Sequence, residues 1–214
     1  MKYKTNHRTG QPERDCLPST GGSVGNGTDQ SYFEADGTLR FDGAATVWND
    51  AFVDAMSLQG GATDPPVFAA FQNTIYGRRF DNATIMSAHG TIEIPHDYKE
   101  GSAIDLHIHW SPTTTNTGNC RWGVEWTIAN INGVFGASTT TYAVQAGAGV
   151  INTHQIVDVV AISGTGRKIS DVIYFRVFRD GNNAADTFTG NSFLHRIAIH
   201  YMCDTVGSRD EMVK

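Results

Sequence analysis

Hydrophobic and polar residues alternate along most of the chain after about residue 84. The stretch AIDLHIHW at positions 103–110 is the clearest case. Successive side chains of a β-strand point to opposite faces, so this stretch predicts a strand with one apolar face and one mixed face. The apolar face carries Ile104, Leu106, Ile108 and Trp110, and the other face carries Ala103, Asp105, His107 and His109. We expect the apolar face to lie in the core.

The same alternation recurs in CRWGVEWTIANI at 120–131, and we expect further strands in TTTYAVQA, HQIVDVVAI, KISDVIYFRVFRD and NSFLHRIAIHYMC. β-Branched and aromatic residues fill these stretches, and glycine-rich turns separate them. About eight strands between Thr38 and Cys203 predict an all-β antiparallel β-sandwich, with an eight-stranded jelly roll as the expected topology. On the last expected strand, the alternation places His195 and His200 on opposite faces.

The N-terminal part of the chain follows a different pattern. Residues 1–35 include the linker-like stretch LPSTGGSVGNGTDQ, so we expect an extended or flexible N-terminal arm there and a β-sandwich domain over 36–214. The arm either stays free or becomes ordered on a neighbouring subunit. The spacing of apolar residues in ATVWNDAFVDAM (45–56) predicts a short helix, and PPVFAAFQ (65–72) predicts a second helical turn.

Composition and charge exclude some classes of protein. Only 18% of the 214 residues are charged, the net charge is −6, and no run of Lys or Arg occurs, so we expect no nucleic-acid-binding face. No apolar run reaches the length of a membrane span, and the polar N-terminus lacks the apolar stretch of a secretory signal. The three cysteines, Cys16, Cys120 and Cys203, form no CxxC pair, which favours free thiols in a reducing compartment.

His107 and His109 are the first candidates for a functional site. Two histidines at i and i+2 on one strand face can bind a single transition metal when a carboxylate completes the set. Gly101 and the His-x-His pair resemble the first half of a cupin metal motif, but no Glu follows in WSPTTTN and the second motif is absent. Glu125 is the nearest substitute. We therefore expect no metal, no cofactor and no catalytic residue, and we expect both histidines to be structural and hydrogen-bonded to neighbours.

Trp122 and Trp126 are candidates for a different kind of site. They share a strand face with Val124 and Ile128, which favours packing in the core. The alternative is that they are exposed and stack on sugar rings, as in a carbohydrate-binding module.

The run PHDYKEGSAIDLHIHWSPTTTNTGNCRWGVEWTIANINGVFG at 95–136 resembles a family of virion structural proteins from tailed bacteriophages and prophages. The matching residues are Pro95-His96, Tyr98, Lys99-Glu100-Gly101, His107-Ile108-His109-Trp110, Trp122, Glu125-Trp126 and Ala129-Asn130-Ile131. The resemblance extends from about Thr46 to the C-terminal HYMCDTVGSRDE. One departure is Ser111, where many relatives have a Glu after His-Trp.

The resemblance implies a structural subunit of a tailed-phage or phage-derived particle, not an enzyme. It implies an accessory protein of the head, neck or tail, such as a spike or fibre base. Its partners would be other copies of itself and other virion structural proteins, and it would be made in the host cytoplasm and located in the virion. Two alternatives stay open. One is a carbohydrate-binding module that recognises host surface polysaccharide, and the other is a cupin-like metal-dependent enzyme that uses His107, His109 and Glu125.

Overall fold

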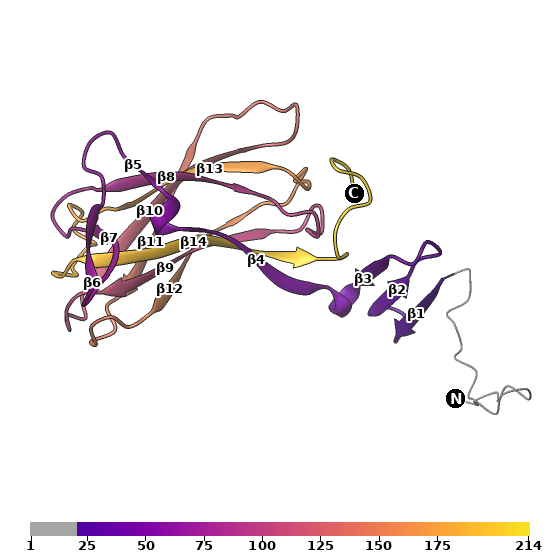
Figure 1. Ribbon diagram of the computed structural model, residues 1–214, viewed down its shortest axis with the longest axis horizontal. Helices are drawn as coiled ribbons and strands as arrows, with labels where there is room; N and C mark the ends of the chain where they lie inside the picture. Colours follow the sequence, from indigo (N-terminus) through magenta and orange to yellow (C-terminus); the bar gives the residue numbers. More distant parts are fainter. Residues whose placement is uncertain (1–20) are drawn as a thin grey trace, which may run out of the picture.

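The computed structural model describes residues 21–214, and in this range the chain is an all-β protein built around an antiparallel β-sandwich (Figure 1). A five-stranded sheet and a six-stranded sheet form the two layers, and a separate three-stranded sheet precedes them. The all-β class and the antiparallel sandwich expected from the sequence are thus confirmed. The expectations for residues 1–20, including Cys16 and the first part of the arm, lie outside the described residues.

The five-stranded sheet has the order β11-β10-β13-β8-β5. Its strands, in this order, are Thr139–Ala146, Asn119–Ala129, Val172–Arg179, Ser87–Glu93 and Gln59–Gly60. The six-stranded sheet has the order β12-β9-β14-β7-β6, and β4 also pairs with β14. These strands, with β4 last, are Gln155–Ile162, Ile104–Pro112, Ser192–Cys203, Ile75–Phe80, Val67–Gln72 and Val47–Asp54. The two sheets thus contain more strands than the eight expected, and the jelly-roll topology stays a prediction.

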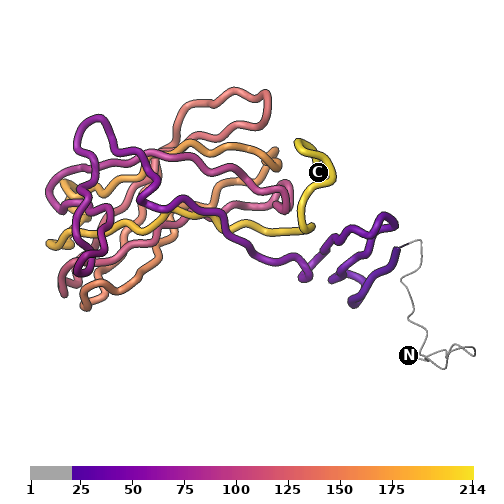
Figure 2. Tube along the Cα trace, viewed as in Figure 1, coloured from indigo at the N-terminus to yellow at the C-terminus, as the bar shows by residue number. Residues whose placement is uncertain are grey.

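The three-stranded sheet lies apart from the sandwich, at the other end of β4 (Figures 1 and 2). Its strands are β1 (Gly22–Gly25), β2 (Gln30–Phe33) and β3 (Leu39–Asp42), so it spans the arm boundary expected at residue 35. The C-terminal segment after β14 runs beside this small sheet, where the backbone N–H of Phe41 donates to the carbonyl of Asp204 at 2.7 Å.

The core lies between the two sheets of the sandwich. Ile104, Leu106, Ile108 and Trp110 of β9 are completely buried, which confirms the apolar face predicted for this strand. Trp122 and Val124 of β10 are also completely buried, and the indole rings of Trp110 and Trp122 lie 6.2 Å apart across the core. The free thiols of Cys120 and Cys203 are buried, where a cysteine packs as a small apolar side chain.

Both predicted helices are wrong. Residues 47–54 form β4 and residues 67–72 form β6, while the only helical turns in residues 21–214 are the 3-10 turns η1 (Gly43–Ala45) and η2 (Ala55–Ser57). Every residue of β4 pairs with a residue of β14. A single amphipathic turn or two is marginal as a helix in water, so the backbone hydrogen bonds offered by β14 outweigh the local pattern. The helical turns described are far too short to span a membrane.

Candidate functional site

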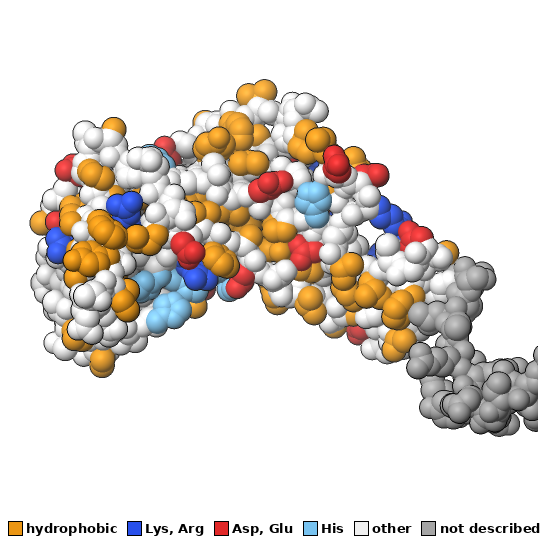
Figure 3. Space-filling view, viewed as in Figure 1, with side chains coloured by type: hydrophobic (Ala, Val, Ile, Leu, Met, Phe, Trp, Pro, Cys, Tyr) orange, Lys and Arg blue, Asp and Glu red, His pale blue; other side chains and the backbone are white. Residues whose placement is uncertain are grey.

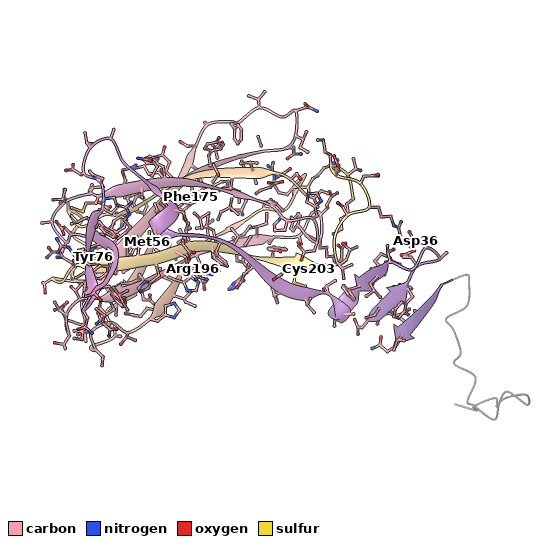
Figure 4. All side chains as sticks on the ribbon, viewed as in Figure 1. Asp36, Met56, Tyr76, Phe175, Arg196 and Cys203 are labelled. Carbon is pink, nitrogen blue, oxygen red and sulfur yellow. The ribbon has the colours of Figure 1, made fainter. Side chains whose placement is uncertain are left out.

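Five histidines meet on the outer face of the six-stranded sheet, and we call this set the histidine row. Its members come from β9, β14 and the loop before β12; they are His200, His107, His109, His154 and His195. Successive ring centroids along the row are 4.1, 5.0, 5.0 and 5.9 Å apart. Figure 3 shows a group of histidine side chains on this side of the sandwich, and Arg196, labelled in Figure 4, comes from β14 beside them.

Hydrogen bonds fix the protonation of the three central imidazoles. The Nδ1 of His107 lies 3.4 Å from the carbonyl oxygen of Asp105; because a carbonyl only accepts, this nitrogen carries the proton. The Nε2 of His107 then accepts from the Nε2 of His109 at 3.1 Å. The Nδ1 of His109 in turn accepts from the Nε2 of His154 at 2.8 Å. In this arrangement His107 and His109 each make a hydrogen bond through both ring nitrogens with a single proton on the ring.

Burial and the neighbouring imidazoles lower the pKa of three histidines of the row, His107, His109 and His195. Burial, and then the neighbouring His107 and His154, lower the pKa of His109 from 6.5 to about 4. Burial, and then His200, lower the pKa of His107. Burial, and then His154, lower the pKa of His195 to about 4. A second proton on any of these rings would place a cation beside another imidazole in a poorly hydrated setting.

A β-bulge brings His195 into the row. The pairing of β14 with β9 shifts register between Leu194 and Arg196, so His195 and His200 do not lie on opposite faces as the simple alternation predicted. Instead the Nε2 of His195 lies 2.8 Å from the Oγ of Ser111, on the same outer face as His107. One extra residue in a strand reverses the facing of every residue beyond it.

The structure brings His107 and His109 together but leaves Glu125 elsewhere. Glu125 lies on β10 of the other sheet, where its carboxylate accepts from the Oγ of Ser138 at 2.8 Å and from Arg176 at 3.1 Å. Within residues 21–214, no group of three or more His, Cys, Asp or Glu side chains is placed to hold a metal ion. We expected the two histidines to be hydrogen-bonded to neighbours, and the structure supplies mainly other imidazoles as partners. The contribution of His154 could not be seen from strand alternation, because it comes from a loop.

A second candidate site is a groove of about 390 Å³ on the outer face of the five-stranded sheet, which we call the β10–β13 groove. The side chains that line it from outward-facing strand positions and the β10–β11 loop are His89, Thr91, Glu125, Thr127, Ser138, Tyr174 and Arg176. Phe175, labelled in Figure 4, faces the core from β13, so its neighbours on that strand face outward. The groove volume lies within the range of about 300–1,000 Å³ that is typical of small-molecule sites.

Gly123 on β10 makes room for an aromatic ring, that of Phe178, beside the β10–β13 groove. Gly123 pairs with Phe178 and with Tyr142 on its two sides. A Cβ at Gly123 would lie 2.4 Å from the Phe178 ring, so only glycine leaves room for this ring beside the strand. The guanidinium of Arg176 lies 4.3 Å from the centre of the Phe178 ring, which holds Arg176 beside Glu125.

No model of a known protein family matches the chain, and no curated protein matches it in sequence. Among solved structures, it is similar to a family 30 carbohydrate-binding module with 8% identity, 75% of this chain and 99% of the other covered, and a TM-score of 0.38. It is also similar to dimeric latent PorU from Porphyromonas gingivalis, with 9% identity, 73% of this chain and 13% of the other covered, and a TM-score of 0.34. A third similar structure is that of infectious bursal disease virus, Gx strain, with 6% identity, 78% of this chain and 39% of the other covered, and a TM-score of 0.31. These weak similarities define no particular function for the chain.

Proposed function

We propose that this protein is a structural subunit of a tailed-phage or phage-derived particle and that it assembles with copies of itself. The position we favour is an accessory one on the head, neck or tail, such as a spike or fibre base. The proposed role is non-catalytic, its partners are other virion structural proteins, and its location is the virion. The resemblance of residues 95–136 to virion structural proteins is the first support for this assignment.

The observation that carries the proposal is the exposure of strand β4. This strand connects the small sheet to the sandwich, and only one of its edges is paired within the described part of the chain. Three of its large apolar side chains remain about half exposed, Val47 at 55%, Trp48 at 57% and Phe52 at 49%, while Val53 packs against the core. An edge strand with exposed apolar side chains is a site for pairing with another chain, and natural monomers normally protect such edges.

The two ends of β4 support self-association in particular. The small sheet projects away from the sandwich (Figure 2), so it can reach a neighbouring copy without disturbing the core. Most homo-oligomers are symmetric, so every copy uses the same contact surface. An edge strand together with a projecting sheet provides such a repeated contact.

Sedimentation velocity of the full chain at high concentration tests the assembly. We expect an oligomer, and we expect the double variant Trp48→Glu with Phe52→Glu to sediment as a monomer because two charges on β4 oppose its burial. Val134→Glu is the matched control, since Val134 is 91% exposed on a loop away from β4. A full-length protein that stays monomeric at all concentrations would remove the assembly role, and absence of the protein from purified particles would remove the virion role.

Saccharide binding is the second candidate function, and the β10–β13 groove favours it. The sugar-stacking alternative depended on Trp122 and Trp126 being exposed. Trp122 is completely buried, and Trp126 is partly buried and packs against the core although it also borders the groove. Tyr174, at the edge of the groove, is 54% exposed and is available in their place.

A further inference from the structure

We propose that the β10–β13 groove binds a neutral saccharide, with Tyr174 as the stacking platform and Glu125 and Arg176 as the hydrogen-bonding groups. The inference deepens the second candidate function and is independent of the assembly role. It concerns the face of the five-stranded sheet, which is the opposite side of the sandwich from the histidine row.

The position of Tyr174 suits it to a stacking role. The ring of Phe135, from the β10–β11 loop, packs perpendicular to the ring of Tyr174 with centroids 5.2 Å apart. This contact holds Tyr174 in place, yet Tyr174 remains 54% exposed. A fixed and exposed aromatic ring presents a flat apolar surface at little entropic cost, and the C–H face of a pyranose ring matches such a surface.

The polar groups beside Tyr174 are arranged in register. Thr127 and Thr91 lie opposite Tyr174 on the two neighbouring strands, and Glu125 and His89 lie opposite Arg176 in the next row. The carboxylate of Glu125 is bonded to Ser138 and Arg176, but about a third of each charged side chain stays exposed. A carboxylate and a guanidinium side by side can each make two hydrogen bonds to adjacent hydroxyl groups.

The charges of the groove favour a neutral ligand. Among residues 21–214, Arg176 is the only Lys or Arg that lines the groove, and it is already paired with Glu125 at 3.1 Å. The hydrogen bond from Ser138, and then the one from Arg176, hold the pKa of Glu125 below its usual value, so this carboxylate remains ionised. A phosphate or a uronic acid would meet that negative charge with no free cation to offset it. A peptide strand would add at a sheet edge, whereas this groove lies on a sheet face.

A glycan array probed with the labelled full-length protein tests the inference. The array should hold neutral hexose and pentose oligosaccharides and, as a comparison, sialylated and uronate-containing glycans. We expect binding to neutral glycans only. Isothermal titration with the best neutral oligosaccharide then provides a dissociation constant for each variant.

Three variants locate the site. Tyr174→Ala removes the platform, and Glu125→Gln keeps the shape but breaks the ion pair; we expect each to raise the dissociation constant by about tenfold or more. Tyr174→Phe keeps the platform and should bind within about threefold of the native protein. Tyr76→Ala is the matched control, because Tyr76 is similarly exposed, at 49%, on the β6–β7 hairpin of the other sheet (Figure 4).

Three binding results would overturn the inference: no neutral glycan bound, a preference for acidic glycans, or unchanged affinity in both Tyr174→Ala and Glu125→Gln. A changed sedimentation coefficient of Tyr174→Ala would also overturn it, because the groove would then be a contact between copies. Near-UV circular dichroism confirms that each variant is folded, and Glu125→Gln has nearly the native size. A protein that forms oligomers but binds no neutral glycan would fail this test and keep the assembly role. A monomer that binds neutral glycans through Tyr174 would support this inference and remove the assembly role.

Discussion

At the scale of single residues, one buried ion pair anchors the loop between β13 and β14. Arg179, the last residue of β13, is completely buried. Its Nε and Nη2 donate to the two oxygens of Asp186 at 2.9 and 2.7 Å, and its other N–H groups reach the carbonyls of Phe188 and Gly190. These bonds place the Phe188 ring 6.0 Å from that of Trp110 in the core. This part of the loop, with Phe188 and Gly190, is therefore buried, while residues 182–185 remain exposed.

Replacing Arg179 with Met should destabilise the protein by about 3–5 kcal/mol, because it leaves the buried carboxylate of Asp186 without its cation. The backbone N–H of Arg121, which donates to this carboxylate at 2.9 Å, would then be the remaining hydrogen-bond donor to this side chain within the described residues. Urea unfolding of the variant measures the loss. The double variant Arg179→Met with Asp186→Leu should recover part of this free energy, since it removes both charges. A loss below about 1 kcal/mol in the single variant would contradict this account and show that water replaces the pair.

At the scale of the element, strand β14 determines the pairing in the centre of the six-stranded sheet and the faces on which its histidines lie. It pairs with β9 along one side and with both β4 and β7 along the other. Its bulge at Leu194/Arg196 lets Leu194 and Ile197 both face the core, with exposures of 2% and 0%, although three positions separate them. The same bulge brings His195 and His200 to one face. The histidine row therefore depends on a single extra residue in a central strand.

The histidine row should make stability fall as the pH is lowered from about 6.5 toward about 4. His107, His109 and His195 have lowered pKa values in the folded protein. The unfolded chain therefore binds more protons in this window, and proton binding stabilises it relative to the folded protein. Stability from this source is complete above pH 6.5 and is lost on acidification. Each fully responding histidine contributes a slope of up to about 1.4 kcal/mol per pH unit.

Urea unfolding between about pH 7 and pH 5 measures this slope while most carboxylates stay ionised. The groups that face the row from neighbouring strands are Asp50 on β4, Asp105 on β9, Asp158 on β12 and Arg196 on β14. His109→Gln should flatten the slope at a cost in stability at pH 7. His96→Gln is the control, because His96 bonds Ser170 and Ser208 away from the row. Equal slopes in native protein and His109→Gln would refute the assignment.

At the scale of the whole molecule, the small sheet and the sandwich differ in how they are stabilised. The strands β1, β2 and β3 contain no buried residue, whereas β9 and β14 are mostly buried. The ties between the small sheet and the C-terminal segment include exposed contacts such as Arg209 with Asp36 at 2.9 Å. An exposed ion pair adds about 0–1 kcal/mol. The small sheet should thus open without unfolding of the sandwich.

Amide hydrogen exchange checks this expectation. In the isolated chain, residues 22–42 should exchange orders of magnitude faster than residues 104–112, because little apolar burial opposes their local opening. In the assembled state, protection of residues 22–42 should rise if a neighbouring copy covers them. Equal protection of the two regions in a monomer would contradict the expectation and place the small sheet within the cooperative unit of the sandwich.

Sequence alone determined the class of fold and the faces of the central strands. The alternation in residues 103–110 and 120–128 identified the side chains that meet in the core, because burial of one sheet face requires a period of two. The alternation could not show whether residues 47–54 and 67–72 form helices or strands. Their apolar residues fit a helical spacing as well as a strand, and only pairing with β14 and β7 selects the strand.

Tertiary structure decided the two candidate sites. The His-x-His pair is visible in the sequence, but the row needs a loop residue, His154, and a bulge that no pattern marks. The β10–β13 groove joins Glu125 to Arg176, 51 positions away, through strand pairing alone. Local periodicity reports which way a side chain faces, because that depends on its own strand. Which side chains stand next to each other depends on strand order and register, and the whole core sets these together.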